Sequence, residues 1–267
     1  MTFAELTSVE RVDSDSFVVT IDPSSWIIRG PNGGYLAALI VRAIEARVAD
    51  LDGPARPMRS LTLHYPAAPV AGPATITTRI VRAGRSLSTI AADLAQDGKV
   101  MVTALAACSP PWGGPTWADE RMPDVPSPEA VPLTDRKLAL PYMEWWQQRH
   151  ALGSGVFSNG AVAETGGWLA LDDGGATPTD AAVVAAMADA WPPAIFVRGA
   201  EPSAVPTVDL TVHFRVTLPT PLLPPGSPAL VRFTTKTAAE GFIEEDGHIW
   251  SPDGTLIAHS RQLAVIF

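Results

Sequence analysis

The segments "SLTLHY" (60–65) and "DLTVHF" (209–214) decide the fold, because one pattern of residue types occurs twice at an offset of 149 residues. Two further pairs follow in the same order. "GPATITTRIV" (72–81) matches "GSPALVRFTT" (226–235), and "QDGKVMVTALAACS" (96–109) matches "PDGTLIAHSRQLAV" (252–265). Three matches in one order indicate two copies of a single module.

Each copy is predicted to contain one strand, one helix and four further strands, with an Asp-Gly hairpin before the last strand. The expected ranges are 16–21, helix 30–48, 59–66, 74–83, 87–96 and 99–108 in the first copy, and 161–171, helix 178–193, 207–217, 228–238, 240–250 and 255–266 in the second. The predicted class is α+β, with domains over 1–110 and 141–267 and a Pro-rich connector over 111–140.

The second predicted helix is unusual because it has no polar face. Asp189 is the only charged residue between positions 181 and 197. A helix that is apolar all round must be enclosed on every side. We therefore expect its own sheet to wrap it and the other copy to cover the rest, with the lone carboxylate facing a ligand groove.

Composition excludes several classes of protein. The 267 residues carry a net charge of −9, which disfavours binding to nucleic acid or to an anionic membrane surface. No run of about 20 apolar residues is present, and the N-terminus has no apolar signal segment, so a cytoplasmic protein is expected. With one cysteine, Cys108, and no ligand-spaced histidines, we expect no metal site and no cofactor.

Three segments carry a family resemblance: "GGYLAALIVRA" (33–43), "GRSLSTIAADLAQDGKVMVTALAAC" (84–108) and "DGTLIAHSRQ" (253–262). Together with the duplication, they resemble hotdog-fold thioesterases, and specifically the double-hotdog acyl-CoA thioesterases of the TesB type. The resemblance implies two curved antiparallel sheets, each wrapped around a central helix. It also implies an acyl-CoA substrate, a role in fatty acid metabolism and one site between the two hotdogs.

The same resemblance implies that Asp189, Thr207 and Gln262 hold the attacking water. The first copy has Ala106 at the position equivalent to Gln262 and no acid in "YLAALIVRA", so only one site is expected. Regular strand alternation would turn Thr207 toward the more polar face of its strand. Its role in the site therefore requires an irregular start of that strand.

Backbone N–H groups at the start of the first helix, at Asn32, Gly33 and Gly34, are the expected donors to the oxyanion, because a helix N-terminus has unpaired donors and a favourable dipole. Arg82 and Arg85 are candidates for contacts with the CoA phosphates. Each of these residues also has a purely structural interpretation, as a helix-start turn or as a solvated arginine.

Two alternatives to a thioesterase remain at this point. A non-catalytic acyl-CoA or acyl-carrier binding protein could use the same groove and would tolerate loss of Asp189. A hotdog dehydratase would need a histidine paired with an acid at the helix, and neither predicted helix contains a histidine. Because a double hotdog still has sheet edges to cover, a homodimer is also expected.

Overall fold

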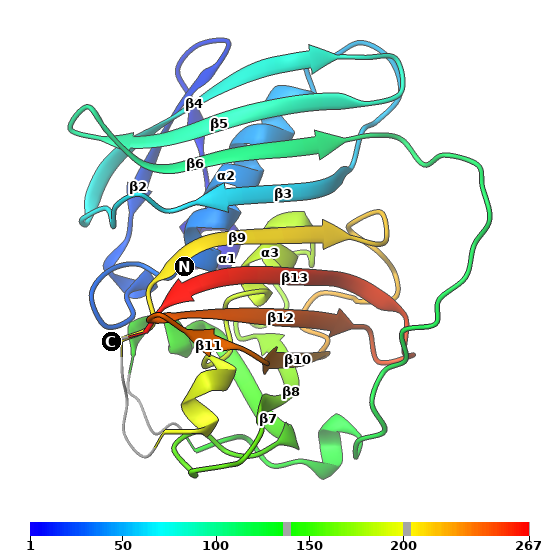
Figure 1. Cartoon of the computed structure of the whole chain (residues 1–267). Helices are drawn as coiled ribbons and strands as arrows, with labels where there is room; N and C mark the ends of the chain where they lie inside the picture. The colour runs from blue at the N-terminus through cyan, green and yellow to red at the C-terminus, as the bar shows by residue number, and fades with distance from the viewer. Residues whose placement is uncertain (136–139, 200–203, 267) are drawn as a thin grey trace.

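The computed structural model describes residues 1–135, 140–199 and 204–266 (Figure 1). The helices are α1 (Phe3–Leu6), α2 (Gly33–Val48) and α3 (Ala181–Met187), with short 3-10 turns at η1 (Pro23–Ser25), η2 (Pro128–Ala130), η3 (Pro141–Trp145) and η4 (Ala194–Val197). The strands are β1 (Glu10–Arg11), β2 (Ser16–Ile21), β3 (Met58–His64), β4 (Gly72–Ala83), β5 (Ser88–Gln96), β6 (Lys99–Cys108), β7 (Trp146–Gly153), β8 (Ala163–Leu171), β9 (Thr207–Phe214), β10 (Ala229–Thr235), β11 (Ala238–Ala239), β12 (Phe242–Trp250) and β13 (Leu256–Val265).

The strands of the described chain form one antiparallel sheet in the order β1-β2-β4-β5-β6-β3-β9-β13-β12-β10-β8-β7, with β11 paired to β12. The order is the same in both halves: β2-β4-β5-β6-β3 in the first corresponds to β8-β10-β12-β13-β9 in the second. In both halves the helix follows the first of these strands in the chain. The predicted sequence of strand, helix and four strands is therefore present twice.

The two halves join where β3 pairs with β9 (Figure 1). Thr62 lies directly opposite Thr211, and their Oγ1 atoms are 3.0 Å apart. These two threonines hold the same position in the repeated segments, since 149 residues separate them. The repeated segment of one half therefore pairs with its own counterpart across a local two-fold axis, which makes the sheet continuous.

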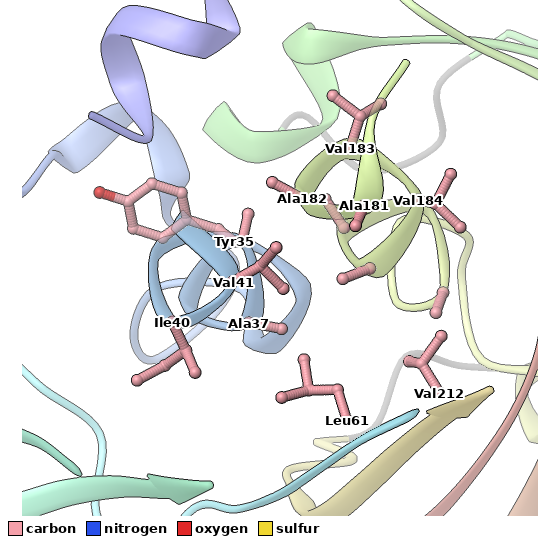
Figure 2. Close-up of a cluster of buried hydrophobic side chains, with 14 of the residues drawn as sticks. Tyr35, Ala37, Ile40, Val41, Leu61, Ala181, Ala182, Val183, Val184 and Val212 are labelled. Carbon is pink, nitrogen blue, oxygen red and sulfur yellow. The ribbon is translucent and has the colours of Figure 1, made fainter. Parts of the chain in front are cut away.

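The two longer helices lie side by side on the inner face of this sheet, above Leu61 of β3 and Val212 of β9 (Figure 2). Asn32 caps the start of α2, where its side chain accepts a hydrogen bond from the Tyr35 N–H at 3.0 Å. Asp180 caps α3 in the same way. Every residue of α3 is buried, so the predicted enclosure of this apolar helix is confirmed.

The second helix is shorter than its apolar sequence indicates. It ends at Met187, and Asp189 lies in the turn that follows, so the prediction of a helix that includes Asp189 is wrong. Pro192 explains the early end, because proline lacks an N–H and its ring clashes with the preceding helical turn. β7 was not predicted, and residues 136–139 of the predicted connector lie outside the described residues.

The connector packs on the outer face of the second half. The Trp168 indole N–H donates to the Pro126 carbonyl at 2.9 Å, and Arg149 Nη1 donates to the Val131 carbonyl at 2.6 Å. Val131 joins a small apolar cluster with Trp168 and Trp250. Within the residues the structure describes, no helix is long and apolar enough to cross a lipid bilayer.

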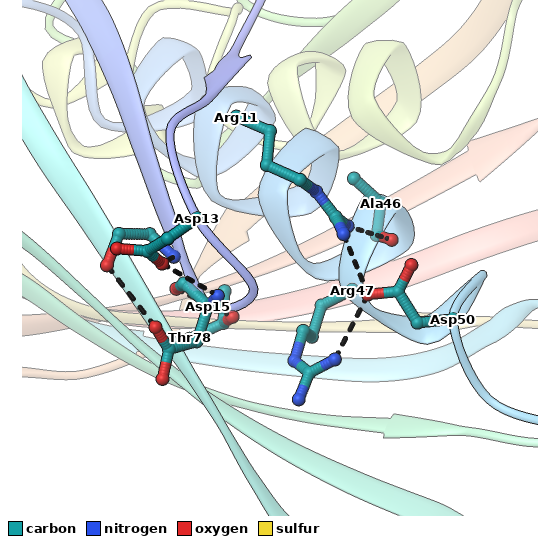
Figure 3. A network of polar contacts seen from close by, with 8 residues as sticks. Arg11, Asp13, Asp15, Ala46, Arg47, Asp50 and Thr78 are labelled. Atoms are coloured by element: carbon teal, nitrogen blue, oxygen red, sulfur yellow. Dashed lines mark hydrogen bonds and ion pairs between the residues drawn. The ribbon is translucent and has the colours of Figure 1, made fainter.

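The N-terminal strand is tied to the end of α2 by charged groups (Figure 3). The Asp50 carboxylate accepts from Arg11 at 2.9 Å and from Arg47 at 3.0 Å. Arg11 also donates to the Ala46 carbonyl at 2.6 Å. These groups are largely exposed, so they orient the strand more than they stabilise the fold.

The inter-half strands provide a stability test. Leu61 on β3 is fully buried beneath the helices, and replacing it with alanine leaves a cavity. We expect Leu61→Ala to lower the free energy of unfolding by about 2–5 kcal/mol, measured by equilibrium unfolding in urea. Leu105→Ala, at a position that is 50% exposed, should change it by less than about 0.5 kcal/mol. Equal losses at the two positions would contradict the placement of this core.

Candidate functional site

A cavity of about 370 Å³ lies where the two halves meet. The first half contributes the segment 27–33 before and at the start of α2, and the second contributes 189–193 and the start of β9. Most of its wall is apolar, including Ile27, Leu36, Leu140, Met143, Val156, Trp191, Phe196 and Val205. Its polar residues include Asn32, Tyr65, Tyr142, Gln148, His150, Thr165, Asp189 and Thr207. An apolar cavity with a few polar groups is typical of a small-molecule site.

Asp189 projects from the second half onto the N-terminus of α2 in the first. Its Oδ2 accepts from the Gly34 N–H and from Asn32 Nδ2, both at 3.0 Å. The same Asn32 amide donates to the Asp189 backbone carbonyl at 2.8 Å. A helix N-terminus offers unpaired N–H groups and the positive end of the helix dipole, so it stabilises a carboxylate at this place.

Two glycines make this contact possible. A Cβ on Gly34 would lie 2.7 Å from the Ala186 carbonyl oxygen and 3.0 Å from the Asp189 Cβ. A Cβ on Gly33 would lie 3.0 Å from Asp189 Oδ2. The start of α2 can therefore approach the end of α3 closely only because both positions lack a side chain.

The pKa of Asp189 reflects two opposing effects. Burial is the larger effect and raises the pKa to about 6, because a carboxylate loses its hydration. The hydrogen bonds from Gly34, Gly33 and Asn32 favour the charged form and limit the increase. Asp189 is thus mostly ionised at pH 7 and can still accept a proton, as a general base must.

Thr207 reaches the cavity because β9 starts irregularly. Leu263 of β13 pairs with Asp209, but the next residue, Ala264, pairs with Thr207, so Val208 is an extra residue in β9. Such a β-bulge reverses the side on which the following side chain lies. Thr207 therefore lines the cavity, although regular alternation would point it outward. The irregular strand start that its role required is present.

Gln262 lies behind Thr207 and is itself buried. The Thr207 hydroxyl donates to Gln262 Oε1 at 3.3 Å, and Gln262 Nε2 donates to Glu245 Oε1 at 2.9 Å. The other carboxylate oxygen, Glu245 Oε2, accepts from the Ala194 N–H at 2.5 Å. A hydrogen-bonded chain thus runs from the cavity wall at Thr207 to a buried acid.

Glu245 was missed in the sequence, although a signal was present. In "FIEEDGHIW" (242–250), strand alternation places Glu245 on the same face as Ile243 and Ile249, which are buried. Its side chain is 3% exposed, and burial raises its pKa to about 7. The bonds from Ala194 and Gln262 lower the pKa, while the nearby carboxylates of Asp189 and Asp246 raise it further.

The backbone N–H groups at the start of α2, which were predicted to face an oxyanion, have partners within the protein. The Asn32 N–H donates to the Ser25 carbonyl at 2.8 Å, and the Gly34 N–H donates to Asp189. Of the three predicted oxyanion donors, Asn32 and Gly33 line the cavity. The carboxylate, rather than a vacant donor pair, is therefore the partner of this helix start.

The predicted phosphate-binding arginines do not reach the cavity. Arg82 and Arg85 are exposed at the turn between β4 and β5, at the end of the sheet opposite to the start of β9 (Figure 1). Arg29, which the sequence did not single out, is exposed and lines the cavity. Among the described residues that line the cavity, the exposed charged groups are Arg29, from the segment before α2, and Asp135.

Comparison with protein families gives two adjacent matches. Residues 22–109 match the acyl-CoA thioesterase N-terminal domain, and residues 118–266 match the acyl-CoA thioesterase C-terminal domain. A thioesterase-like protein of Talaromyces wortmannii, TwmA, is 34% identical over 98 residues. That match covers 36% of this chain and 27% of TwmA. The resemblance predicted from the sequence is confirmed.

Solved structures are similar over nearly the whole chain. A protein of unknown function with a hotdog fold, from Alicyclobacillus acidocaldarius, is 26% identical with a TM-score of 0.88, covering 99% of this chain and 97% of that one. The acyl-CoA thioesterase II TesB2 of Mycobacterium marinum is 17% identical with a TM-score of 0.77, covering 100% and 98%. At this lower identity the likeness concerns the fold alone. The likeness to the Alicyclobacillus protein identifies the fold as a hotdog fold.

The buried carboxylate provides a second prediction. The pKa of Asp189 is higher in the folded chain than its ordinary value of 3.8, so folding favours the protonated acid. That contribution is present at pH 4 and is lost as the pH rises through 6. We expect the stability of Asp189→Asn relative to wild type to rise by about 2 kcal/mol between pH 4 and 7.5, measured by urea unfolding.

Glu45 titrates in both proteins, so its effect cancels in this difference. Asp189→Asn also removes a charge that raises the pKa of Glu245, and this adds to the expected rise in the same direction. A difference that stays constant between pH 4 and 7.5 would show that Asp189 has an ordinary pKa.

Proposed function

The chain belongs to the acyl-CoA thioesterase family, and from this premise we propose that it hydrolyses an acyl-CoA thioester to a free acid and CoA with a water activated by Asp189. The observation that carries the proposal is the position of Asp189. It lines the cavity between the halves, is held by the N-terminus of α2 and has a pKa raised to about 6.

We also propose that the architecture is a double hotdog, with two curved sheets that each wrap a central helix. The identical strand order in the two halves and the contact between α2 and α3 support it. The corresponding domains are 1–110 and 141–267, joined by a connector over 111–140. The first half has Ala106 at the position equivalent to Gln262, so we propose that the cavity between the halves is the single site.

In the proposed reaction, a water in the cavity donates one hydrogen bond to the Asp189 carboxylate and another to the Thr207 oxygen. Both Gly34 and Asn32 bond to Asp189 Oδ2, so we assign the water to Oδ1. The water oxygen attacks the thioester carbonyl carbon while Asp189 takes its proton. The C–S bond then breaks, and the proton passes from Asp189 to the departing thiolate.

The start of α2 stabilises the charge throughout this sequence. Before attack, its donors face the Asp189 carboxylate. When Asp189 accepts the proton, negative charge moves from the carboxylate to the thioester oxygen in the same cavity. Because the Asn32 N–H donates to Ser25 and the Gly34 N–H donates to Asp189, we propose that Asn32, Gly33 and Gly34 stabilise the oxyanion through the positive end of the helix dipole. The positive end of the α2 dipole thus stabilises first the Asp189 carboxylate and then the thioester oxyanion.

The apolar wall indicates where the acyl group lies. Met143, Trp191 and Phe196 supply apolar surface in the second half, and Leu36 supplies it in the first. Arg29, which lines the cavity and is exposed, is placed to meet an anionic part of CoA. Arg82 and Arg85 do not line the cavity, so we assign them no contact with the acyl end of the substrate.

The test is thiol release from a panel of acyl-CoAs of increasing chain length. Wild type should release CoA, and Asp189→Asn should lose about 10²- to 10⁴-fold in kcat because an amide cannot take the proton. Asp172→Asn is the matched control, since Asp172 is exposed and bonds to Gln147 at 3.0 Å. It should retain wild-type kcat.

The same panel of acyl-CoAs distinguishes a thioesterase from a non-catalytic acyl-CoA binding protein. If acyl-CoA raises the melting temperature of wild type and Asp189→Asn alike while neither releases thiol, the chain is an acyl-CoA binding protein. Wild-type activity retained by a folded Asp189→Asn would instead remove Asp189 from the mechanism.

A further inference from the structure

Glu245 has no role in the reaction as described so far, although it is buried and connected to the cavity by Gln262 and Thr207. We propose that Glu245 is a positioning residue: it fixes the direction of the hydrogen bonds through Gln262, so that the Thr207 oxygen is left to accept from the attacking water. This inference rests on the proposed thioester hydrolysis.

The first step concerns the Gln262 amide. An ionised carboxylate accepts hydrogen bonds and donates none. Glu245 accepts one from the Ala194 N–H and one from the Gln262 side chain. In the ionised form of Glu245, Gln262 therefore presents its Nε2 to that carboxylate, and its Oε1 faces the other way, toward Thr207. The chemistry of the acid removes the usual ambiguity between the two ends of an amide.

The second step concerns Thr207. Because Gln262 Oε1 can only accept, the Thr207 hydroxyl must donate its hydrogen to Gln262. The lone pairs of the Thr207 oxygen are then available to the cavity. A water between Thr207 and Asp189 can donate one hydrogen bond to each of them. Its own lone pair remains free to attack the thioester carbonyl.

The reverse arrangement would be unproductive. If Gln262 turned its Nε2 to Thr207, the hydroxyl would accept from Gln262 and point its hydrogen into the cavity. That hydrogen would bond to the water oxygen and occupy the lone pair that must attack. Glu245 therefore selects between two hydrogen-bond patterns that have the same heavy-atom positions.

Glu245 lies where a carboxylate is costly to bury, so its presence indicates that a carboxylate is needed at this position. Its side chain is 3% exposed, and the charges acting on it, those of Asp189 and Asp246, have the same sign as its own. Burial of an acid beside like charges is costly. A glutamine would cost less to bury, but it would accept from Ala194 through its oxygen and donate to Gln262 through its nitrogen. Only an acceptor at both ends gives the observed direction.

The test compares Glu245→Gln with the exchange Glu245→Gln/Gln262→Glu. The single change reverses the Gln262 amide, so we expect kcat to fall about 10- to 100-fold with KM nearly unchanged. In the exchange, Gln at 245 accepts from Ala194 and donates to Glu at 262, which accepts from Thr207. The original direction returns, and kcat should recover most of the loss.

Glu244→Gln is the matched control. Glu244 is the neighbouring residue on the opposite face of β12, where it accepts from the Lys236 and Thr237 N–H groups at 2.9 Å each. It should retain wild-type kcat. In a Thr207→Val background, Glu245→Gln should cause little further loss, because the hydroxyl through which Glu245 acts is absent.

Several results would overturn the inference. A wild-type kcat in folded Glu245→Gln would do so while leaving the proposed function intact, provided that Asp189→Asn remains inactive. An exchange variant that melts at the wild-type temperature but stays inactive would also overturn the inference. This second result decides the matter if Glu245→Gln alone fails to fold. A wild-type chain that releases no thiol contradicts the proposed function and this inference together.

Discussion

The hydrogen bond between the Gly34 N–H and the Asp189 carboxylate is the contact on which the site depends. It joins the start of the helix in one half to the turn after the helix in the other. The approach is possible because position 34 has no side chain to strike the Ala186 carbonyl. Each half alone would therefore lack either the acid or the helix start that stabilises it. In the proposed reaction, the site therefore requires both halves of the duplicated chain.

Burial and hydrogen bonding together set the pKa values of the two buried acids. Around Asp189, loss of hydration outweighs the hydrogen bonds, and the pKa settles near 6, where the acid is mostly charged at neutral pH and still basic. Around Glu245 the same effects produce a value near 7. In the proposed reaction, the first acid faces the cavity and takes the proton. The second lies behind Gln262, where we infer that it sets the direction of the bonds that hold the water.

Sequence patterns predicted the fold closely because the repeat and the strand alternation are local and strong. The family resemblance implied Asp189, Thr207 and Gln262 as candidates, and the need for an irregular strand start at Thr207 followed from alternation. Other features depend on three-dimensional packing. The occupation of the Gly34 N–H by Asp189 could not be read from residues 155 positions apart in the chain. Glu245 could have been found, since its alternation placed an acid among buried residues.

The central claim is that Asp189 activates a water and does not attack the thioester itself. A carboxylate can also act as a nucleophile, forming an anhydride that water later opens. Single-turnover hydrolysis in ¹⁸O-labelled water, with enzyme in excess over acyl-CoA, detects an anhydride that water opens at the Asp189 carbonyl, because that opening leaves ¹⁸O in the carboxylate. Activation of a water by Asp189 should leave one ¹⁸O atom in the released acid and none in the Asp189 carboxylate. Label in the peptide that contains Asp189 would contradict it.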